Sequence, residues 1–229
     1  MSFDPDRVDT LTFDSYSTVV DVDSAATALD EHLPEDVPSE RLSNLWRAHS
    51  IMYTLVANHL DTYGTFYEYN RQALTHALET FGVDAAEQTR DEILAVYMDL
   101  DVFTDVESGM ARLADAYDIY IVSNGDPAML DAMVQVADIE ASVEDTISAD
   151  EVETYKPAAT LYEHAAERAG TDIENVAHTS AGWFDVQGAA HAGMQGVWVN
   201  RDDDPWVRFD GEPDLEVVDL HALADALGV

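Results

Sequence analysis

Residues 8–17, VDTLTFDSYS, form a short apolar run that ends abruptly in polar residues, as a buried strand does at its carboxyl end. Residues 117–127, YDIYIVSNGDP, repeat this arrangement with a β-branched run that stops at Ser-Asn-Gly. Three further strand patterns occur later in the chain, at residues 175–182, 196–200 and 215–220. The two opening stretches therefore predict neighbouring strands whose polar ends meet at one edge of a sheet.

Helical patterns separate these strands. Residues 127–137 have Asp126 as a candidate N-cap and Pro127 at the first helical position, residues 157–170 end at Gly170, and residues 185–193 are shorter. Strands that alternate with helices predict an α/β fold with a doubly wound parallel, Rossmann-like sheet. Ligands bind such sheets at the carboxyl ends of the strands.

Residues 22–99 break the alternation. Three stretches, 39–60, 66–82 and 87–100, carry apolar residues at helical spacing, and no strand pattern lies between them. A helical block after the first strand predicts an inserted cap over the active edge of the sheet. We therefore expect a core domain of residues 1–21 and 100–229 and a helical cap subdomain of residues 22–99.

The composition is strongly acidic, with 10 basic residues against 47 acidic ones and a formal net charge of −37. Because 47% of the residues are hydrophobic and the acids are spread along the chain, this pattern indicates a folded domain with an acidic surface rather than a disordered tail. Such a surface suits molar salt, where screening limits self-repulsion, so we expect a halophilic protein. Nucleic acid and anionic membranes are poor partners for it.

The chain has no cysteine, which excludes a disulfide framework and thiolate metal sites. Its N-terminus is too acidic for a signal peptide, and no apolar run has the roughly 18 residues that a membrane-spanning helix needs. We therefore expect a soluble, cytoplasmic protein.

Four strand-end positions carry residues with chemical potential: Asp14, the pair Ser123 and Asn124, Lys156, and Asp185. Taken singly, an Asp after a strand is more typical of a turn or an N-cap, and Ser-Asn-Gly is more typical of a turn. Lys156 stands apart because it is the only lysine in the chain, and it lies within an acidic run. The order of these positions together indicates a site.

The chain resembles the haloacid dehalogenase superfamily and, within it, the L-2-haloacid dehalogenases. The resemblance runs from about residue 10 to residue 225. It is carried by FDSYSTVVDVDS at 13–24, IVSNGDPAMLD at 121–131, YKPAATLY at 155–162, TSAGWFDVQGAAHAG at 179–193 and LWR at 45–47. It implies hydrolysis of short L-2-halo acids to D-2-hydroxy acids, with water as the second substrate.

Asp14 takes the position of the family's nucleophile. Its carboxylate would attack the halogen-bearing carbon from behind, expel halide and leave an aspartyl ester, with inversion at that carbon. Lys156 would place an ammonium among the carboxylates and lower their pKa by proximity. The alternative is that Lys156 is a chance surface lysine. That is a poor explanation, because the chain has no other lysine.

The resemblance also implies roles for further side chains. Ser123 would hold the substrate carboxylate, and Thr18 and Tyr162 would support the nucleophile region, with Tyr162 also among the substrate-binding residues. Ser180 and Asp185 would serve ester hydrolysis, with Asp185 as the general base. The expected halide cradle consists of Arg47, Asn124 and Phe184. Tyr16 and Trp46 would line an apolar pocket, although aromatic residues are more often plain core.

Tyr16 separates this chain from the phosphatases of the superfamily, which have an Asp general acid two places after the nucleophile. Because only Asp14 and Asp185 remain of the acidic residues that hold magnesium in those enzymes, we expect no metal ion and no other cofactor. A phosphatase-like activity is nevertheless the alternative within the superfamily. Release of phosphate that depends on magnesium would favour it.

Two residues depart from the dehalogenase pattern. Ser17 stands where a glycine is expected, which would strain the turn, and Gly182 stands where an asparagine is expected near the hydrolytic water. Both favour a second alternative, a catalytically weak relative that binds small carboxylates. The cap helices carry an apolar face, so we expect a homodimer.

Overall fold

The computed structural model describes residues 3–229. Its centre is a sheet in which every neighbouring pair of strands is parallel. In spatial order the strands are β5 (Asp145–Ser148), β4 (Asp118–Ser123), β1 (Thr10–Phe13), β6 (Val176–Ser180), β7 (Gln195–Val199) and β8 (Leu215–Val217). The chain runs from β1 outward through β4 to β5 and then crosses to β6 on the other side of β1. The predicted doubly wound α/β fold is confirmed.

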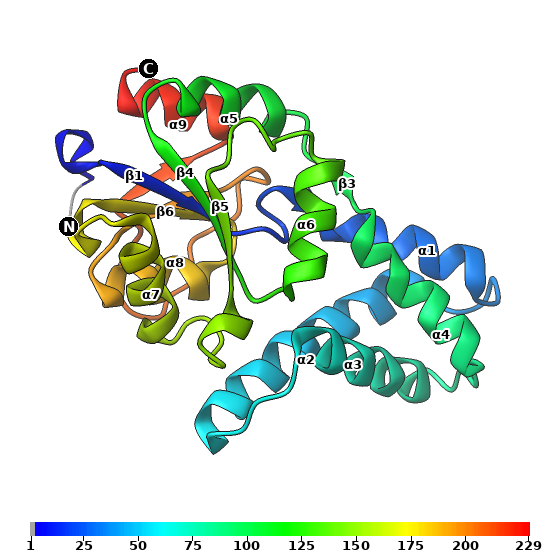
Figure 1. The fold of residues 1–229 in the computed structure, drawn as a ribbon. Helices are drawn as coiled ribbons and strands as arrows, with labels where there is room; N and C mark the ends of the chain where they lie inside the picture. Colours follow the sequence, from blue (N-terminus) through cyan, green and yellow to red (C-terminus); the bar gives the residue numbers. More distant parts are fainter. Residues whose placement is uncertain (1–2) are drawn as a thin grey trace.

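Helices cover both faces of this sheet. Figure 1 shows α5 and α9 together on one face and α7 and α8 on the other, with α6 beside β5. The helices are α5 (Val106–Ala114), α6 (Pro127–Val136), α7 (Ala159–Ala169), α8 (Trp183–Ala192) and α9 (Leu220–Leu227). Burial on both faces explains why β1, β6 and β7 have no exposed residue.

The register brings the strand ends to one level. Phe13, the last residue of β1, lies opposite Ile121 of β4 and Thr179 of β6. Asp14 therefore emerges at the same edge as the last residues of both neighbouring strands. This edge lies where the chain reverses its direction across the sheet, which is the usual binding crevice of doubly wound folds.

The predicted helical block is present, with one helix before the first helical stretch that the sequence predicted at 39–60. It contains α1 (Ala25–His32), α2 (Ser39–Leu60), α3 (Phe66–Thr80) and α4 (Glu87–Leu94), followed by a 3₁₀ turn at Ala95–Met98. Figure 1 shows these helices grouped beside the carboxyl edge of the sheet. Where the chain enters and leaves them, β2 (Val20–Asp21) pairs antiparallel with β3 (Asp101–Val102). The boundary of a cap subdomain at residues 22–99 remains our proposal.

Several elements differ from the sequence expectation, which did not include α5, α9, β2, β3 or β5. The expectation of three helices in residues 22–99 was wrong by one, because α1 is too short for a clear apolar period. The expected third helix, 87–100, ends as a 3₁₀ turn after Leu94. Strand β5 was not predicted, because it has only four residues, of which Asp145 is exposed, and its sequence lacks an apolar run.

Candidate active site

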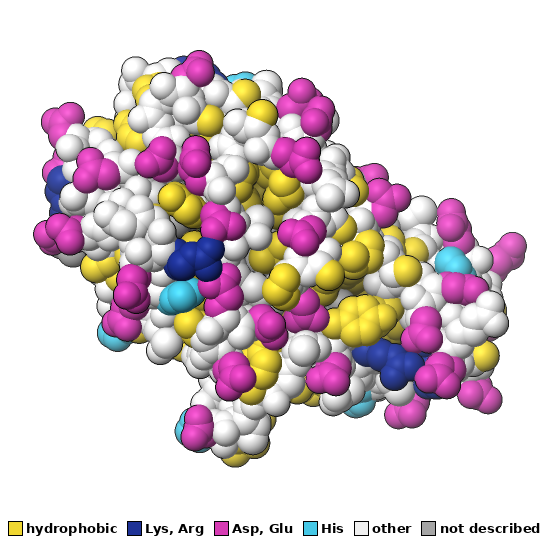
Figure 2. Space-filling model, in the orientation of Figure 1, with side chains coloured by type: hydrophobic (Ala, Val, Ile, Leu, Met, Phe, Trp, Pro, Cys, Tyr) yellow, Lys and Arg dark blue, Asp and Glu magenta, His cyan; other side chains and the backbone are white. Residues whose placement is uncertain are grey.

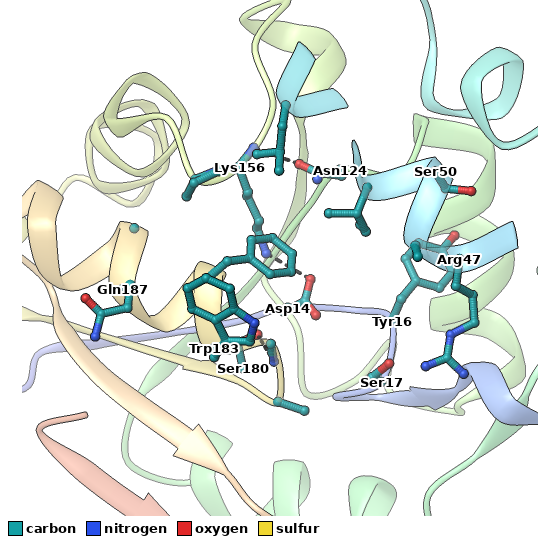
Figure 3. A pocket seen from close by; sticks show the side chains of 18 of the residues that line it. Asp14, Tyr16, Ser17, Arg47, Ser50, Asn124, Lys156, Ser180, Trp183 and Gln187 are labelled. Carbon is teal, nitrogen blue, oxygen red and sulfur yellow. Dashed lines mark hydrogen bonds and ion pairs between the residues drawn. The ribbon is translucent and has the colours of Figure 1, made fainter. Parts of the chain in front are cut away.

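The only lysine of the chain lies between two carboxylates. Asp14 follows β1, Asp185 lies in the first turn of α8, and Lys156 lies in the segment before α7. Lys156 Nζ is 2.9 Å from Asp14 Oδ1 and 2.8 Å from Asp185 Oδ2. The side chains of Lys156 and Asp185 are each 2% exposed, whereas that of Asp14 is 15% exposed. One buried ammonium thus serves two carboxylates, and the more accessible one is Asp14 (Figure 3).

The two carboxyl groups respond differently to this environment. Burial raises the pKa of Asp14 above its ordinary value, and Lys156 offsets that rise only in part. Burial would also raise the pKa of Asp185, but His178 and Lys156 outweigh it and hold this pKa well below its usual range. Lys156 lowers the pKa of both carboxyls, as expected, but at Asp14 desolvation outweighs this effect and the net shift is upward.

Lys156 itself remains an ammonium. Burial works to lower its pKa, but Asp14 and Asp185 outweigh that effect, and the pKa is raised. Its backbone is also fixed, because Lys156 N donates to Asn124 Oδ1 at 2.9 Å. Asn124 was expected in a halide cradle; the structure shows it lining the cavity and anchoring the lysine at the same time.

Asp14 has a second support on its other oxygen. Thr18 Oγ1 donates to Asp14 Oδ2 at 3.2 Å and accepts from Ala181 N at 2.9 Å. Asp14 N donates to Thr179 O at 2.9 Å. Thr18 is fully buried, so it positions the carboxylate from behind and joins the loop after β1 to the loop after β6.

Asp185 is held by more donors than the sequence indicates. Tyr162 Oη donates to Asp185 Oδ1 at 2.6 Å, and burial beside Asp185 raises the pKa of Tyr162 far above its ordinary value, so it stays a phenol. His178 Nε2 lies 3.0 Å from Asp185 Oδ2. Sequence reasoning missed His178; a polar residue inside the apolar run of β6, two places before Ser180, was the available signal.

A cavity of about 910 Å³ opens in front of this centre. Of the predicted residues it is lined by Asp14, Tyr16, Arg47, Asn124, Lys156, Ser180 and Phe184. Its remaining wall is largely apolar and includes Ile51, Phe66 and Trp183 (Figure 3). Trp46 is fully buried, and its indole Nε1 donates to Asn70 O at 2.9 Å. It is therefore a core residue, which was the alternative interpretation of it.

Two predicted substrate-binding side chains do not line this cavity. Ser123 is fully buried; its Oγ lies 2.6 Å from Ser15 Oγ and accepts from Gly125 N at 2.9 Å. Tyr162 is also fully buried, behind Asp185. Asp185, expected to meet water directly, likewise lies behind Lys156 rather than in the wall. These side chains shape the site from within the core: Ser123 from the end of β4, Tyr162 from α7 and Asp185 from α8.

Arg47 does lie on α2 at the cavity, as expected. Its guanidinium forms an ion pair with Asp23, whose side chain is 77% exposed. Figure 3 shows the guanidinium extending past Tyr16 and not toward Asp14. In this structure Arg47 is therefore occupied by an acidic partner that the sequence did not single out.

The two unusual positions differ in their backbone. Ser17 has φ of 67°, a left-handed conformation that glycine adopts without cost, so the expected strain in this turn is present. Gly182 has φ of −79°, which any residue adopts. A Cβ there would lie 3.4 Å from Phe184 Cε1 and 3.5 Å from Ser180 Oγ, which are ordinary contacts. Nothing in the backbone therefore demands a glycine at 182.

Asp126 connects the sheet edge to the cap helices. Its carboxylate accepts from Phe66 N at 2.9 Å and from Tyr67 N at 3.1 Å, the first two residues of α3. It was expected to cap its own helix, α6, but its side chain makes no capping bond there. A carboxylate suits an unpaired helix N-terminus, so the same residue type serves the neighbouring helix instead.

Among residues 3–229 no group of three His, Cys, Asp or Glu side chains is arranged to hold a metal ion. Within the same residues, none of the helices combines the length and the apolarity needed to cross a bilayer.

Comparisons with known proteins agree with this geometry. The family model of the haloacid dehalogenase-like hydrolases matches residues 8–193. (S)-2-haloacid dehalogenase 4A of Burkholderia cepacia is 29% identical over 84% of this chain and 83% of its own. The (S)-2-haloacid dehalogenase of Pseudomonas sp. strain YL is also 29% identical, over 96% of this chain and 94% of its own.

A solved structure is similar over nearly the whole chain. It is L-2-haloacid dehalogenase from Xanthobacter autotrophicus with chloropropionic acid covalently bound, which superposes with a TM-score of 0.89 at 26% identity. The match covers 96% of this chain and 98% of that one. With its parallel sheet, its inserted helices and its strand-end carboxylates, the chain belongs to the haloacid dehalogenase-like hydrolases.

Proposed function

We propose that this protein hydrolyses short L-2-haloalkanoic acids to D-2-hydroxy acids through an ester on Asp14. The observation that carries the proposal is the buried Lys156, which holds Asp14 and Asp185 at the base of an open cavity. The activity named for the curated relatives and the covalently bound chloropropionic acid of the structural neighbour support it.

In the first step the Asp14 carboxylate attacks the carbon that bears the halogen. A carbon–oxygen bond forms, the carbon–halogen bond breaks, and the halide leaves with the bonding pair. Lys156 and Thr18 fix the two oxygens of Asp14, so the attack requires no rotation of the carboxylate. Because halide leaves without a proton, this step needs no general acid, which fits the phenol of Tyr16 two places after Asp14.

The substrate must also bring its own carboxylate and halogen to the cavity. Arg47 and Lys156 line it and carry positive charge. The ion pair between Arg47 and Asp23 is partly open to solvent, so it contributes little stability and a substrate anion competes with it. We infer that substrate binding draws Arg47 from Asp23 toward the departing halide.

In the second step water attacks the ester carbonyl of Asp14, and Asp185 takes the proton. The tetrahedral intermediate collapses, and Asp185 passes its proton to the leaving alkoxide. The second proton of the water leaves the Asp14 carboxyl for solvent, so the carboxylate returns. Esterification removes the charge of Asp14, so Lys156 then has Asp185 as its remaining carboxylate partner. We infer that Lys156 thereby shifts and opens a path for water between Asp14 and Asp185.

Halide release from L-2-chloropropanoate tests the proposal, with chiral analysis of the product formed in excess EDTA. We expect halide, D-lactate and no effect of the chelator. Retention of configuration, or loss of activity in EDTA with recovery on adding Mg²⁺, would contradict it. Phosphate release from small phosphomonoesters under the same conditions would identify the phosphatase-like alternative instead.

A catalytically weak carboxylate-binding protein is the second candidate, and Gly182 and the strained Ser17 favour it. It predicts that 2-chloropropanoate binds, measurable by calorimetry, without halide release above that of the buffer. Release of halide at enzymatic rates excludes it.

We further propose that the protein works in a salt-rich cytoplasm. Its net charge is −37, and Figure 2 shows acidic side chains distributed over the visible face with few basic ones. A homodimer is proposed from the apolar side chains that α2 exposes, which are Met52, Leu55, Val56 and Leu60. Light scattering in molar KCl measures the mass directly; a monomer would contradict the dimer.

A further inference from the structure

A fully buried histidine lies in the middle of the central sheet. His178 is the third residue of β6, and its register partner on β1 is Thr12, so the two side chains point to the same face. That face also carries Tyr162, whose ring meets the imidazole edge-on at 5.5 Å between centroids. A buried imidazole is costly unless its nitrogens are bonded, so its partners indicate why it is tolerated.

Both ring nitrogens have a polar neighbour. Nδ1 lies 2.8 Å from Thr12 Oγ1, and Nε2 lies 3.0 Å from Asp185 Oδ2. An ionised carboxylate only accepts hydrogen bonds, so Nε2 must carry the hydrogen. The Thr12 hydroxyl donates to Nδ1 when the imidazole is neutral and accepts from it when the imidazole is charged. His178 therefore presents an N–H to Asp185 at 3.0 Å in either protonation state, as a close polar contact that lacks the alignment of a regular hydrogen bond.

The groups facing Asp185 come from four segments. Tyr162 on α7 donates to Oδ1, while Lys156 and His178 approach Oδ2, and Asp14 faces it across the lysine. Lys156 is shared with Asp14 and has to respond to the change in charge during the reaction. His178 contacts no second carboxylate among the described residues, and its electrostatic effect on Asp14 is weaker than that of Lys156, so its hold on Asp185 depends less on that change.

We propose that His178 is a positioning residue for ester hydrolysis, holding Asp185 by Oδ2 while Lys156 follows the charge on Asp14. This inference rests on the proposed function. It also explains how hydrolysis proceeds with glycine at position 182, because the base is oriented from the sheet side. His178 contacts Asp185 directly and acts on Asp14 only through its charge, more weakly than Lys156, so ester formation on Asp14 depends little on it.

Two variants separate this N–H contact from the volume of the ring. His178→Gln places an amide nitrogen near the position of Nε2 and keeps a donor toward Asp185. His178→Asn is shorter; its amide stays near Thr12 and does not reach Asp185. Circular dichroism and thermal melts in molar KCl check that both variants fold.

The readout is the ratio of two rates. In His178→Asn we expect the pre-steady-state release of halide within about twofold of wild type, and the steady rate slower by about 10- to 100-fold. The acid limb in the pH profile of its steady rate should move to higher pH, because loss of the donor raises the pKa of Asp185. His178→Gln should recover most of the steady rate. Equal losses in both steps, an unmoved limb, or Gln no better than Asn would overturn the proposal.

A measurement without substrate keeps this test separate from the proposed function. In ¹⁵N NMR spectra of wild type, we expect the Nε2 of His178 to carry a hydrogen. In His178→Asn, the ¹³Cγ titration of Asp185 should move to higher pH. An Nε2 without hydrogen, or an unmoved titration, rejects the role of His178. Absence of halide release from wild type, with these spectra as expected, rejects the dehalogenase function alone.

Discussion

Asn58 on α2 and Tyr155, the residue before Lys156, exchange two hydrogen bonds. Asn58 Nδ2 donates to Tyr155 O at 2.7 Å, and Tyr155 N donates to Asn58 Oδ1 at 3.0 Å. The next amide, Lys156 N, donates to Asn124 after β4. The peptide segment that carries the lysine is thus held from a cap helix on one side and from the sheet on the other.

Asn58→Ala should loosen this segment without touching the carboxylates. Two hydrogen bonds are lost at a partly buried position, so we expect the free energy of unfolding to fall by about 1–3 kcal/mol and kcat/KM to fall about tenfold. His59→Ala, at an exposed neighbouring position, is the matched control and should change neither. Denaturant titration and steady-state kinetics measure both effects. Wild-type kcat/KM in Asn58→Ala would show that the lysine is held sufficiently by Asn124.

Lys156→Met should abolish nearly all turnover while the fold persists. Removing the ammonium leaves two buried carboxyls facing each other, so one of them takes a proton and the ionised nucleophile is lost. Lys156→Arg should also turn over poorly, because a planar fork does not replace a compact ammonium between two oxygens. Arg71→Met removes the same charge from an exposed ion pair and should leave kcat unchanged. Near-normal rates in either lysine variant would make Lys156 incidental.

The acid limb of kcat/KM should report Asp14. Because burial raises its pKa, Asp14 stays protonated to a higher pH than an ordinary aspartate, and a protonated carboxyl does not attack. We therefore expect the rate to fall with decreasing pH at a midpoint above about 3.9, the ordinary value. Asp185 has the opposite shift, so it contributes stability above its unfolded pKa that is lost as the pH falls further. A rate midpoint at or below the ordinary value would contradict this assignment.

The sheet and the site edge could be predicted from the sequence because they follow from local patterns. A strand that ends in Asp14, and a second that ends in Ser123, place both residues at one edge whatever the rest of the chain does. Gly170 and Gly193 end α7 and α8 with positive φ, as their positions indicated. Elements with few residues, such as β5 and α1, lie below the length at which an apolar period is visible.

The partners of the site residues could not be predicted, because they depend on tertiary contacts. Nothing local pairs Arg47 with Asp23, directs Asp126 to α3, or brings His178 to Asp185. Ser123 and Tyr162 were expected to bind substrate because of the resemblance. A resemblance indicates the position of a residue in the chain, but not whether its side chain reaches the cavity. The competition between burial and Lys156 at Asp14 also requires the structure, since desolvation has no signature in sequence.

Stability should rise with salt. The screening length is about 10 Å at a salt concentration of about 0.1 M and about 3 Å at 1 M. The self-repulsion of a protein with a net charge of −37 is therefore strongest in dilute buffer. We expect the Tm to increase continuously as KCl is raised between these concentrations. Sucrose at matched osmolality is the control, because it favours compact states without screening charge. A flat or falling Tm in KCl, or an equal rise in sucrose, would contradict the halophilic interpretation.

Gly182→Asn should accelerate the second chemical step. Gly182 is the N-cap of α8, and both its φ of −79° and the space that a Cβ would occupy there admit a side chain. An asparagine amide there adds hydrogen-bonding groups beside Ser180, near the path of the hydrolytic water, and favours the helix N-terminus as well.

In wild type, which lacks that amide, we expect the ester on Asp14 to form faster than it is hydrolysed. A burst of halide should then precede a slower steady rate, and mass spectrometry of quenched enzyme should find the substrate acyl group on the peptide that contains Asp14. Gly182→Asn should raise the steady rate about 10- to 100-fold and shrink the burst, corresponding to about 1.5–3 kcal/mol in that step. Gly182→Ala supplies the Cβ without the amide and should retain the wild-type burst. Brisk wild-type turnover with neither burst nor adduct would mean that Ser180, His178 and Asp185 already position the water sufficiently.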